Sequence, residues 1–167
     1  MVLFSNVVFL LAAIISGAIK KWRDYYKTIV YLSFCNLLYN FLCRDYLTWS
    51  YHPDFLLSHQ TADLVNTLIL LPSSAILYLN FFPVIGIGKK VLYYFAWIIG
   101  FSTLEYIWYR RGVITYEHGW NILWSIVFYC AMFFSLWLHH RSTGKALIFS
   151  LVSVILLLLI FKVPFWK

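Results

Sequence analysis

The sequence predicts an all-α fold: a polytopic bundle of about six transmembrane helices that forms one domain over residues 1–167. Hydrophobic residues make up 63% of the 167 residues and charged residues only 11%, a balance that no water-soluble domain of this size sustains. The apolar runs are about 20 residues long, enough for a helix to cross a hydrocarbon core of about 30 Å. They are continuous rather than alternating, which excludes the strands of a membrane barrel.

The first run, residues 2–19, is predicted to be a spanning helix and not a cleavable signal. No Lys or Arg precedes it, no small-x-small cleavage site follows it, and it ends directly in Lys20, Lys21, Trp22 and Arg23. Short polar or basic breaks separate the later runs, and neither a linker tract nor an inverted repeat divides the chain. The later runs cover residues 28–47, 63–82, 91–109, 119–138 and 146–163.

The distribution of Lys and Arg predicts the orientation, because short loops with more positive charge face the cytoplasm. Eight basic residues follow the first, third and fifth helices, and five lie on the other side. Both termini are therefore expected to be extracytoplasmic. The eight are Lys20, Lys21, Arg23, Lys27, Lys89, Lys90, Arg141 and Lys145; the five are Arg44, Arg110, Arg111, Lys162 and Lys167.

Several motifs lack the spacing that their chemistry requires. The Gly86-Ile-Gly88-Lys89-Lys90 segment has neither the Walker spacing nor the preceding strand of a phosphate loop. The three cysteines are odd in number and lack metal-ligand spacing, so they are interpreted as small packing residues. The net charge of +7 suits anionic lipid headgroups, and no nucleic-acid motif accompanies it. The sequence therefore identifies no cofactor and no nucleic-acid partner.

A polar stripe runs along the second helix, where Asn36, Asn40 and Arg44 recur every fourth residue and so share one face. A polar stripe avoids lipid, so this face is expected to point into the bundle. The third helix offers a polar counterpart. Its members are Asp63, Asn66, Thr67 and Ser74.

All acidic residues except Asp24 lie on the side opposite the basic loops. Glu105 lies about one turn inside the fourth helix, where an ionisable group is costly and suggests a functional site. Arg44 is its expected partner, although such a pair also serves simply to hold helices together. The candidate ligand-binding residues are Arg44, Asp45, Asp63, Glu105, His118 and Asn121.

A metal site built from His52, Asp54, His59 and Asp63 is a weaker alternative. Imidazole and carboxylate groups are normal metal ligands, but Pro53 interrupts the segment and the spacing matches no known ligand pattern. No serine lies in a nucleophile-elbow sequence and no acid pair has hydrolase spacing. The sequence therefore predicts neither a metal site nor a set of catalytic residues.

Several sequence elements resemble a family of small multi-helix membrane proteins from spore-forming Gram-positive bacteria. The elements are Trp22-Arg23 with Tyr25-Tyr26, residues 36–41, Glu105, residues 112–116, His118-Gly119-Trp120-Asn121 with Trp124, and His139 or His140. The resemblance covers nearly the whole chain after the first helix. It implies a bacterial plasma-membrane location and supplies no substrate, cofactor or catalytic role.

The predicted function is that of a small-molecule or ion binding or transport component with a polar, outward-facing site. Its expected partners are the lipid bilayer and a small polar ligand or ion. A non-catalytic scaffold is the alternative, and an embedded enzyme is less favoured. A transport component needs a cavity reaching the midplane, an enzyme needs a tight acid–base or metal cluster, and a scaffold needs neither.

Overall fold

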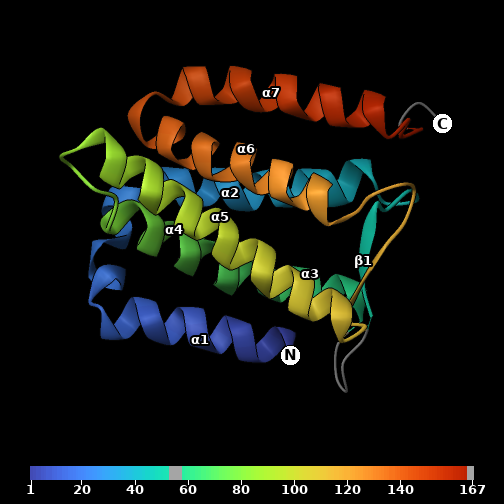
Figure 1. The fold of residues 1–167 in the computed structure, drawn as a ribbon, viewed down its shortest axis with the longest axis horizontal. Helices are drawn as coiled ribbons and strands as arrows, with labels where there is room; N and C mark the ends of the chain where they lie inside the picture. The colour runs from blue at the N-terminus through green and yellow to red at the C-terminus, as the bar shows by residue number, and fades with distance from the viewer. Residues whose placement is uncertain (53–57, 165–167) are drawn as a thin grey trace.

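Helices dominate the computed structural model, which describes residues 1–52 and 58–164 (Figure 1). Each of the six predicted apolar runs is helical for most of its length, which confirms the all-α prediction. The elements are α1 (Val2–Ile15), the 3-10 turn η1 (Ala18–Lys21), α2 (Trp22–Leu42), β1 (Trp49–Tyr51), α3 (His59–Val65), η2 (Asn66–Leu70), α4 (Leu71–Asn80), α5 (Ile87–Arg110), β2 (Ile114–Tyr116), α6 (Ile122–Arg141) and α7 (Thr143–Ile160).

The first two helices end earlier than predicted, and the second also begins earlier. α1 ends at Ile15 because Gly17 adopts a left-handed conformation, with φ of 72°, which glycine reaches without steric cost. α2 then starts at Trp22 and ends at Leu42. Arg44 therefore lies in the turn after α2 and does not continue the stripe of Asn36 and Asn40, so that part of the prediction is wrong.

α3, η2 and α4 form one helix of 22 residues, from His59 to Asn80. Its middle segment, η2, is a π-helix. Pro72 lies at the start of α4 and explains why the helix widens to the π form in the turn before it. Proline has no N–H to donate and its ring collides with the carbonyl four residues earlier, so the preceding turn has to open.

Successive long helices run in opposite directions, and the two termini lie at the same end of the bundle (Figure 1). The α1–α2, α4–α5 and α6–α7 connections meet at the other end. The group of eight basic residues lies in and beside these connections. By length and composition, four helices of the described chain qualify as membrane spans; a fifth span results if α1 and the bent segment Ala18–Leu42 count as one. The chain is therefore a helical protein with the features of a membrane protein.

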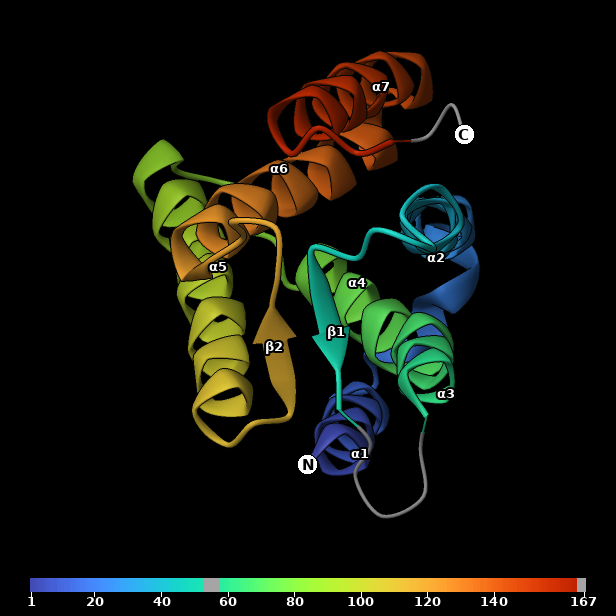
Figure 2. The same cartoon turned by 90° about the vertical axis from the view of Figure 1, so that its right-hand side faces the viewer.

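Two short antiparallel strands, which the sequence did not predict, close the end of the bundle near the termini (Figure 2). Ser50 of β1 pairs with Thr115 of β2, and their hydroxyl groups lie 3.1 Å apart. The pairing joins the α2–α3 connection to the α5–α6 connection. It thereby fixes the position of Tyr51 at the mouth of the bundle.

The helix that contains α4 is the centre of the bundle and α7 lies at its edge. In the most apolar 18-residue window of each helix, 67% of the residues of His59–Asn80 are buried, against 6% in α7. Tyr78 of α4 and Phe133 of α6 are fully buried, and their ring centroids lie 5.0 Å apart. α7 packs on α6 and stands away from α2 (Figure 2). This arrangement leaves space between α2, α6 and α7.

Candidate functional site

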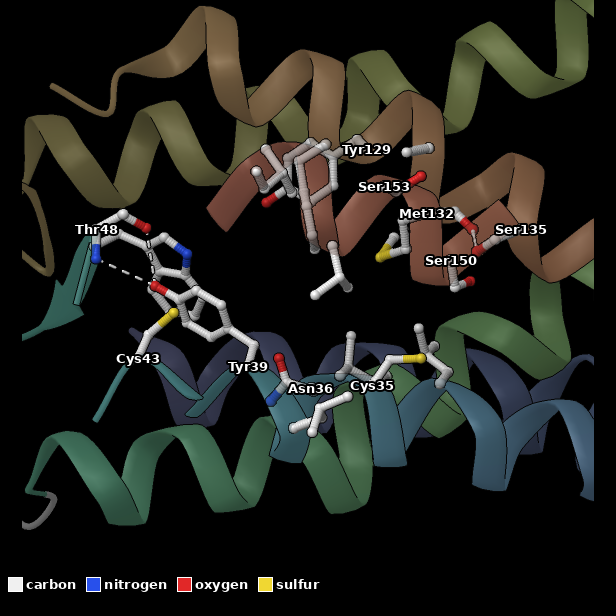
Figure 3. Close-up of a pocket in the computed structure, with 18 of the residues that line it drawn as sticks. Cys35, Asn36, Tyr39, Cys43, Thr48, Tyr129, Met132, Ser135, Ser150 and Ser153 are labelled. Carbon is white, nitrogen blue, oxygen red and sulfur yellow. Dashed lines mark hydrogen bonds between the residues drawn. The ribbon is translucent and has the colours of Figure 1, made fainter. Parts of the chain in front are cut away.

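A cavity of about 400 Å³ lies between α2, α6 and α7, within the size range of about 300 to 1,000 Å³ typical of small-molecule sites. Side chains from α2 face those from α6 and α7 across it (Figure 3). Most of the wall is apolar. Polar groups along it come from all three helices and from the strand end, and include Cys35, Asn36, Tyr39, Thr48, Tyr129, Ser135, Ser150 and Ser153.

Two contacts bridge α2 and α7. Near the middle of both helices the Tyr31 hydroxyl of α2 hydrogen-bonds Ser150 of α7. At the C-terminal ends of the two helices Phe161 and Val163 pack in one buried cluster with Cys43 and Trp120. Both contacts are part of the cavity wall, because Tyr31, Ser150, Phe161 and Val163 all line it.

Asp63 is buried at the outer end of the cavity, with 5% of its surface exposed. Asn40 donates to its carboxylate at 2.7 Å, and Asn36 donates to both carboxylate oxygens at 3.2 and 3.1 Å. Asn36 also donates to Thr67 at 2.8 Å. The polar stripe of α2 therefore faces Asp63 and Thr67, which confirms that part of the prediction.

Glu105 of α5 is the second buried acid of the cavity wall, with 9% of its surface exposed. Three hydroxyl groups donate to it. Tyr116 of β2 donates at 2.7 Å, Ser125 of α6 donates at 2.5 Å, and Tyr129 of α6 donates to the second oxygen. Burial first, and the hydrogen bond to Glu105 second, raise the pKa of the Tyr116 phenol, so this group stays protonated as a donor. Glu105 thus ties α5, β2 and α6 together.

Tyr51 of β1 lies between the two acids. Burial first, and then the negative charges of Asp63 and Glu105, raise the pKa of its phenol well above 10. A row of aromatic rings continues from it along the cavity wall. Its ring lies 5.4 Å from that of Trp49 and 5.9 Å from that of Trp108, and Trp49 stacks on Tyr39 at 5.3 Å.

The expected ion pair between Arg44 and Glu105 does not form in the described part of the chain. Arg44 is exposed in the turn after α2, and the partners of Glu105 are hydroxyl groups. No Lys, Arg or His from the described residues lines the cavity. The two buried carboxylates therefore share the outer end of the cavity with no cationic side chain.

The structure brings together only two of the six predicted ligand-binding residues, Asp63 and Glu105. Asp45 is exposed beside Arg44. The exposed His118 stacks on Tyr46 at 3.6 Å between ring centroids. Asn121 caps α6, where its side chain accepts hydrogen bonds from the N–H groups of Leu123 and Trp124. None of these four residues lines the cavity.

The residues of the weaker metal hypothesis have other partners. His52 lies 2.9 Å from the Thr115 hydroxyl, and His59 accepts a hydrogen bond from the Tyr51 N–H at 3.0 Å. Asp54 lies outside the described residues. Within residues 1–52 and 58–164 no group of three His, Cys, Asp or Glu side chains is placed to hold a metal ion.

Sequence reasoning missed the wall that α6 and α7 contribute. Ser150 and Ser153 are spaced three apart on a leucine-rich helix and so share a face, a signal that was available. Tyr129 and Ser125 are spaced four apart on α6, and one face carries both toward Glu105. The missing information was which helix faces which.

No protein family, curated protein or solved structure matches this chain. The family resemblance of its sequence elements therefore stays a prediction.

Proposed function

We propose that this protein binds a small amphiphilic molecule taken from the membrane. The observation that carries the proposal is the cavity between α2, α6 and α7, which is apolar over most of its wall and has Asp63 and Glu105 in that wall. A largely apolar pocket with a few convergent polar groups is the usual form of a small-molecule site. The apolar part of the ligand lies along α7, and its polar part reaches the acids.

Two features favour a ligand that comes from the lipid rather than from water. α7 packs on α6 and stands away from α2, which it meets at the Tyr31–Ser150 hydrogen bond and at the cluster of Phe161 with Cys43. The β1–β2 pair and Tyr51 cover the outer end of the bundle, where a ligand from water would have to enter. This proposal keeps the predicted small-molecule binding but replaces the polar, outward-facing site with a mainly apolar one that opens toward the lipid.

We also propose that the chain crosses the plasma membrane six times with both termini outside. In this topology α1 and α2 are separate crossings, although α1 has only 14 residues and reaches only about 21 Å at 1.5 Å per residue. The clustering of the basic loops at the end opposite the termini supports the orientation. Transport would require the same cavity to exchange its ligand between two environments.

Photolabelling tests the binding proposal. The purified protein in lipid nanodiscs is treated with azioctanol, an eight-carbon alcohol that carries a photoreactive diazirine, and the labelled residues are mapped by mass spectrometry. We expect labels on the inner faces of α2, α6 and α7, such as Cys35, Met132 and Ser153. Unlabelled octanol should compete, because the cavity is a saturable site.

Two adjacent tryptophan substitutions provide the control. Ser153→Trp fills the cavity and should abolish the saturable labelling. Val152→Trp adds the same ring to the neighbouring position, which is 51% exposed and does not line the cavity, so labelling should persist. Labelling that octanol does not displace, or that Ser153→Trp leaves unchanged, would refute the proposed function.

A further inference from the structure

We propose that the ligand of this cavity is a cationic amphiphile: an ammonium group with an oxygen acceptor beside it and an apolar tail. The inference rests on the proposed function and adds the chemical class of the ligand. Three properties of the outer end of the cavity carry it. They are two carboxylates without a cationic partner, a row of aromatic faces, and an amide donor without an acceptor.

The two carboxylates are held in the way that ionised acids are held. Asp63 accepts hydrogen bonds from Asn36 and Asn40, and Glu105 accepts them from three hydroxyl groups. Hydrogen bonds donated to a carboxylate favour its charged form. A buried charge without an opposite charge is costly. His59, one turn before Asp63, interacts electrostatically with it, but its Nδ1 accepts from the Tyr51 N–H, and no Lys, Arg or His of the described residues lines this cavity. A positively charged ligand supplies the missing charge, whereas an anionic one is repelled.

Aromatic faces add a second attraction for a cation. The rings of Tyr39, Trp49, Tyr51 and Trp108 form a continuous row in the wall beside the acids. The face of an aromatic ring is negative and attracts ammonium groups, with tryptophan the strongest. Aromatic walls combined with acids are the usual surroundings of alkylated ammonium groups.

Asn66 supplies the third property. It lies in the cavity wall, three residues after Asp63, and is 5% exposed. Asn6 donates from its Nδ2 to the carbonyl of Val2 at 3.0 Å and to Oδ1 of Asn66 at 2.7 Å. The Val2 carbonyl can only accept, so the orientation of both amides is determined. The Tyr51 phenol lies beside Asn66 but outside hydrogen-bonding geometry, so the Nδ2 of Asn66 is left buried without an acceptor among the described residues, and an oxygen beside the ligand's ammonium group would satisfy it.

Competition among four eight-carbon ligands tests the class. Each ligand is tested for its ability to displace azioctanol from the protein in nanodiscs of phosphatidylcholine. This lipid has no net charge and therefore does not concentrate any one of the ligands in the membrane. We expect octyltrimethylammonium to compete at about one tenth of the concentration that octanol needs, since a desolvated cation–π contact and a charge pair exceed 1.4 kcal/mol together. Octanoate should be the weakest. Octyl(2-hydroxyethyl)dimethylammonium should be the strongest, because its hydroxyl oxygen reaches Asn66.

Substitutions assign the effect to these residues. Asp63→Asn should reduce the advantage of the ammonium ligands over octanol several-fold while octanol still competes, which also shows that the cavity is intact. Trp49→Leu should reduce the same advantage without changing a charge, and so tests the site if Asp63→Asn does not fold. Asn66→Leu should remove only the gain from the hydroxyl group. Asp45→Asn, an exposed acid outside the cavity, is the matched control and should change nothing.

The outcomes separate the two proposals. If octanol competes and octyltrimethylammonium competes no better, the ligand class is wrong and the binding function stands. If octanoate is the best competitor, the class is wrong for the same reason. If none of the four ligands displaces azioctanol, the proposed binding function itself is wrong.

Discussion

Hydroxyl groups, and not a cation, hold Glu105 in place. Tyr116, Ser125 and Tyr129 come from two different elements and converge on one carboxylate. Ser125 in turn accepts a hydrogen bond from the indole N–H of Trp120 at 2.9 Å. Hydrogen bonds to a charged group are stronger than neutral ones. Glu105 therefore stabilises the contact of α5 with β2 and α6, and it also lines the cavity.

Neutralising Glu105 should therefore destabilise the fold. Glu105→Gln replaces one acceptor oxygen with an NH₂ group, which leaves hydroxyl donors without a partner and should lower the free energy of unfolding by about 1 to 3 kcal/mol. Unfolding of the detergent-solubilised protein in a denaturant series measures this change in the free energy of unfolding. Glu117→Gln is the control. That acid is exposed and lies 4.0 Å from His118, so its change should stay within about 0.5 kcal/mol.

The double variant tests the earlier expectation of an Arg44–Glu105 pair. Because Arg44 is exposed and Glu105 is bonded to hydroxyl groups, the effects of Arg44→Leu and Glu105→Gln should add within about 0.5 kcal/mol. Thermal melting of the two single variants and the double variant measures the coupling. Recovery of stability in the double variant would mean that the two side chains interact after all.

At the level of the elements, glycine and proline decide where the helices end and bend. Gly17 lets α1 stop after 14 residues and turn into η1. Pro72 widens the helix of residues 59–80 at η2, the segment that carries Asn66 into the cavity wall. The π-helix therefore places one of the residues that we assign to ligand binding.

Replacing glycine with alanine should have opposite effects on stability at two positions. Gly17→Ala forces a side chain into a left-handed conformation, which costs roughly 1 to 2 kcal/mol, although no atom lies within 4 Å of the added carbon. Gly100→Ala lies within α5, also with open space around it, and should stabilise the helix by roughly 0.5 to 1 kcal/mol. Melting temperatures in detergent provide the measurement. Equal effects of the two changes would contradict the role given to the Gly17 backbone.

For the whole molecule, the decisive property is the separation of charge between the two ends. The basic loops meet at one end, while the strands, the start of α1 and the end of α7 lie toward the other (Figure 1); Asp63 near the start of α3 and Glu105 near the end of α5 belong to that second end. Lys167 and Asp54 lie outside the described residues and take no part in this comparison. The positive end suits the cytoplasmic surface, where anionic lipids concentrate.

Labelling of single cysteines tests the topology. In a background with Cys35, Cys43 and Cys130 replaced by alanine, exposed residues are changed to cysteine and treated with an impermeant maleimide in intact cells. Arg111→Cys should be labelled from outside, whereas Lys89→Cys and Lys145→Cys should react only after permeabilisation. An N-terminal epitope should be accessible outside. An epitope accessible only after permeabilisation would mean that α1 and α2 form one broken or re-entrant span.

The helices, their approximate limits and the inward face of α2 can be predicted from the sequence. Long apolar runs have to be helical in lipid because no water is present to bond the backbone, and polar side chains spaced four apart have to avoid lipid. These rules predict that the polar stripe faces inward, and the structure shows that Asn36 and Asn40 meet Asp63 there. The charge separation between the ends follows from the order of the loops.

Only the tertiary structure decided the cavity, the strand pair and the partners of Glu105. In a water-soluble helix the apolar face marks the inside, but in lipid the inner and outer faces are both apolar, so the leucine-rich α7 does not reveal which side packs. The cavity arises because α7 docks on α6 and stands away from α2. The placement of α7 opposite α2 also depends on a contact between segments more than a hundred residues apart, the hydrogen bond of Tyr31 with Ser150.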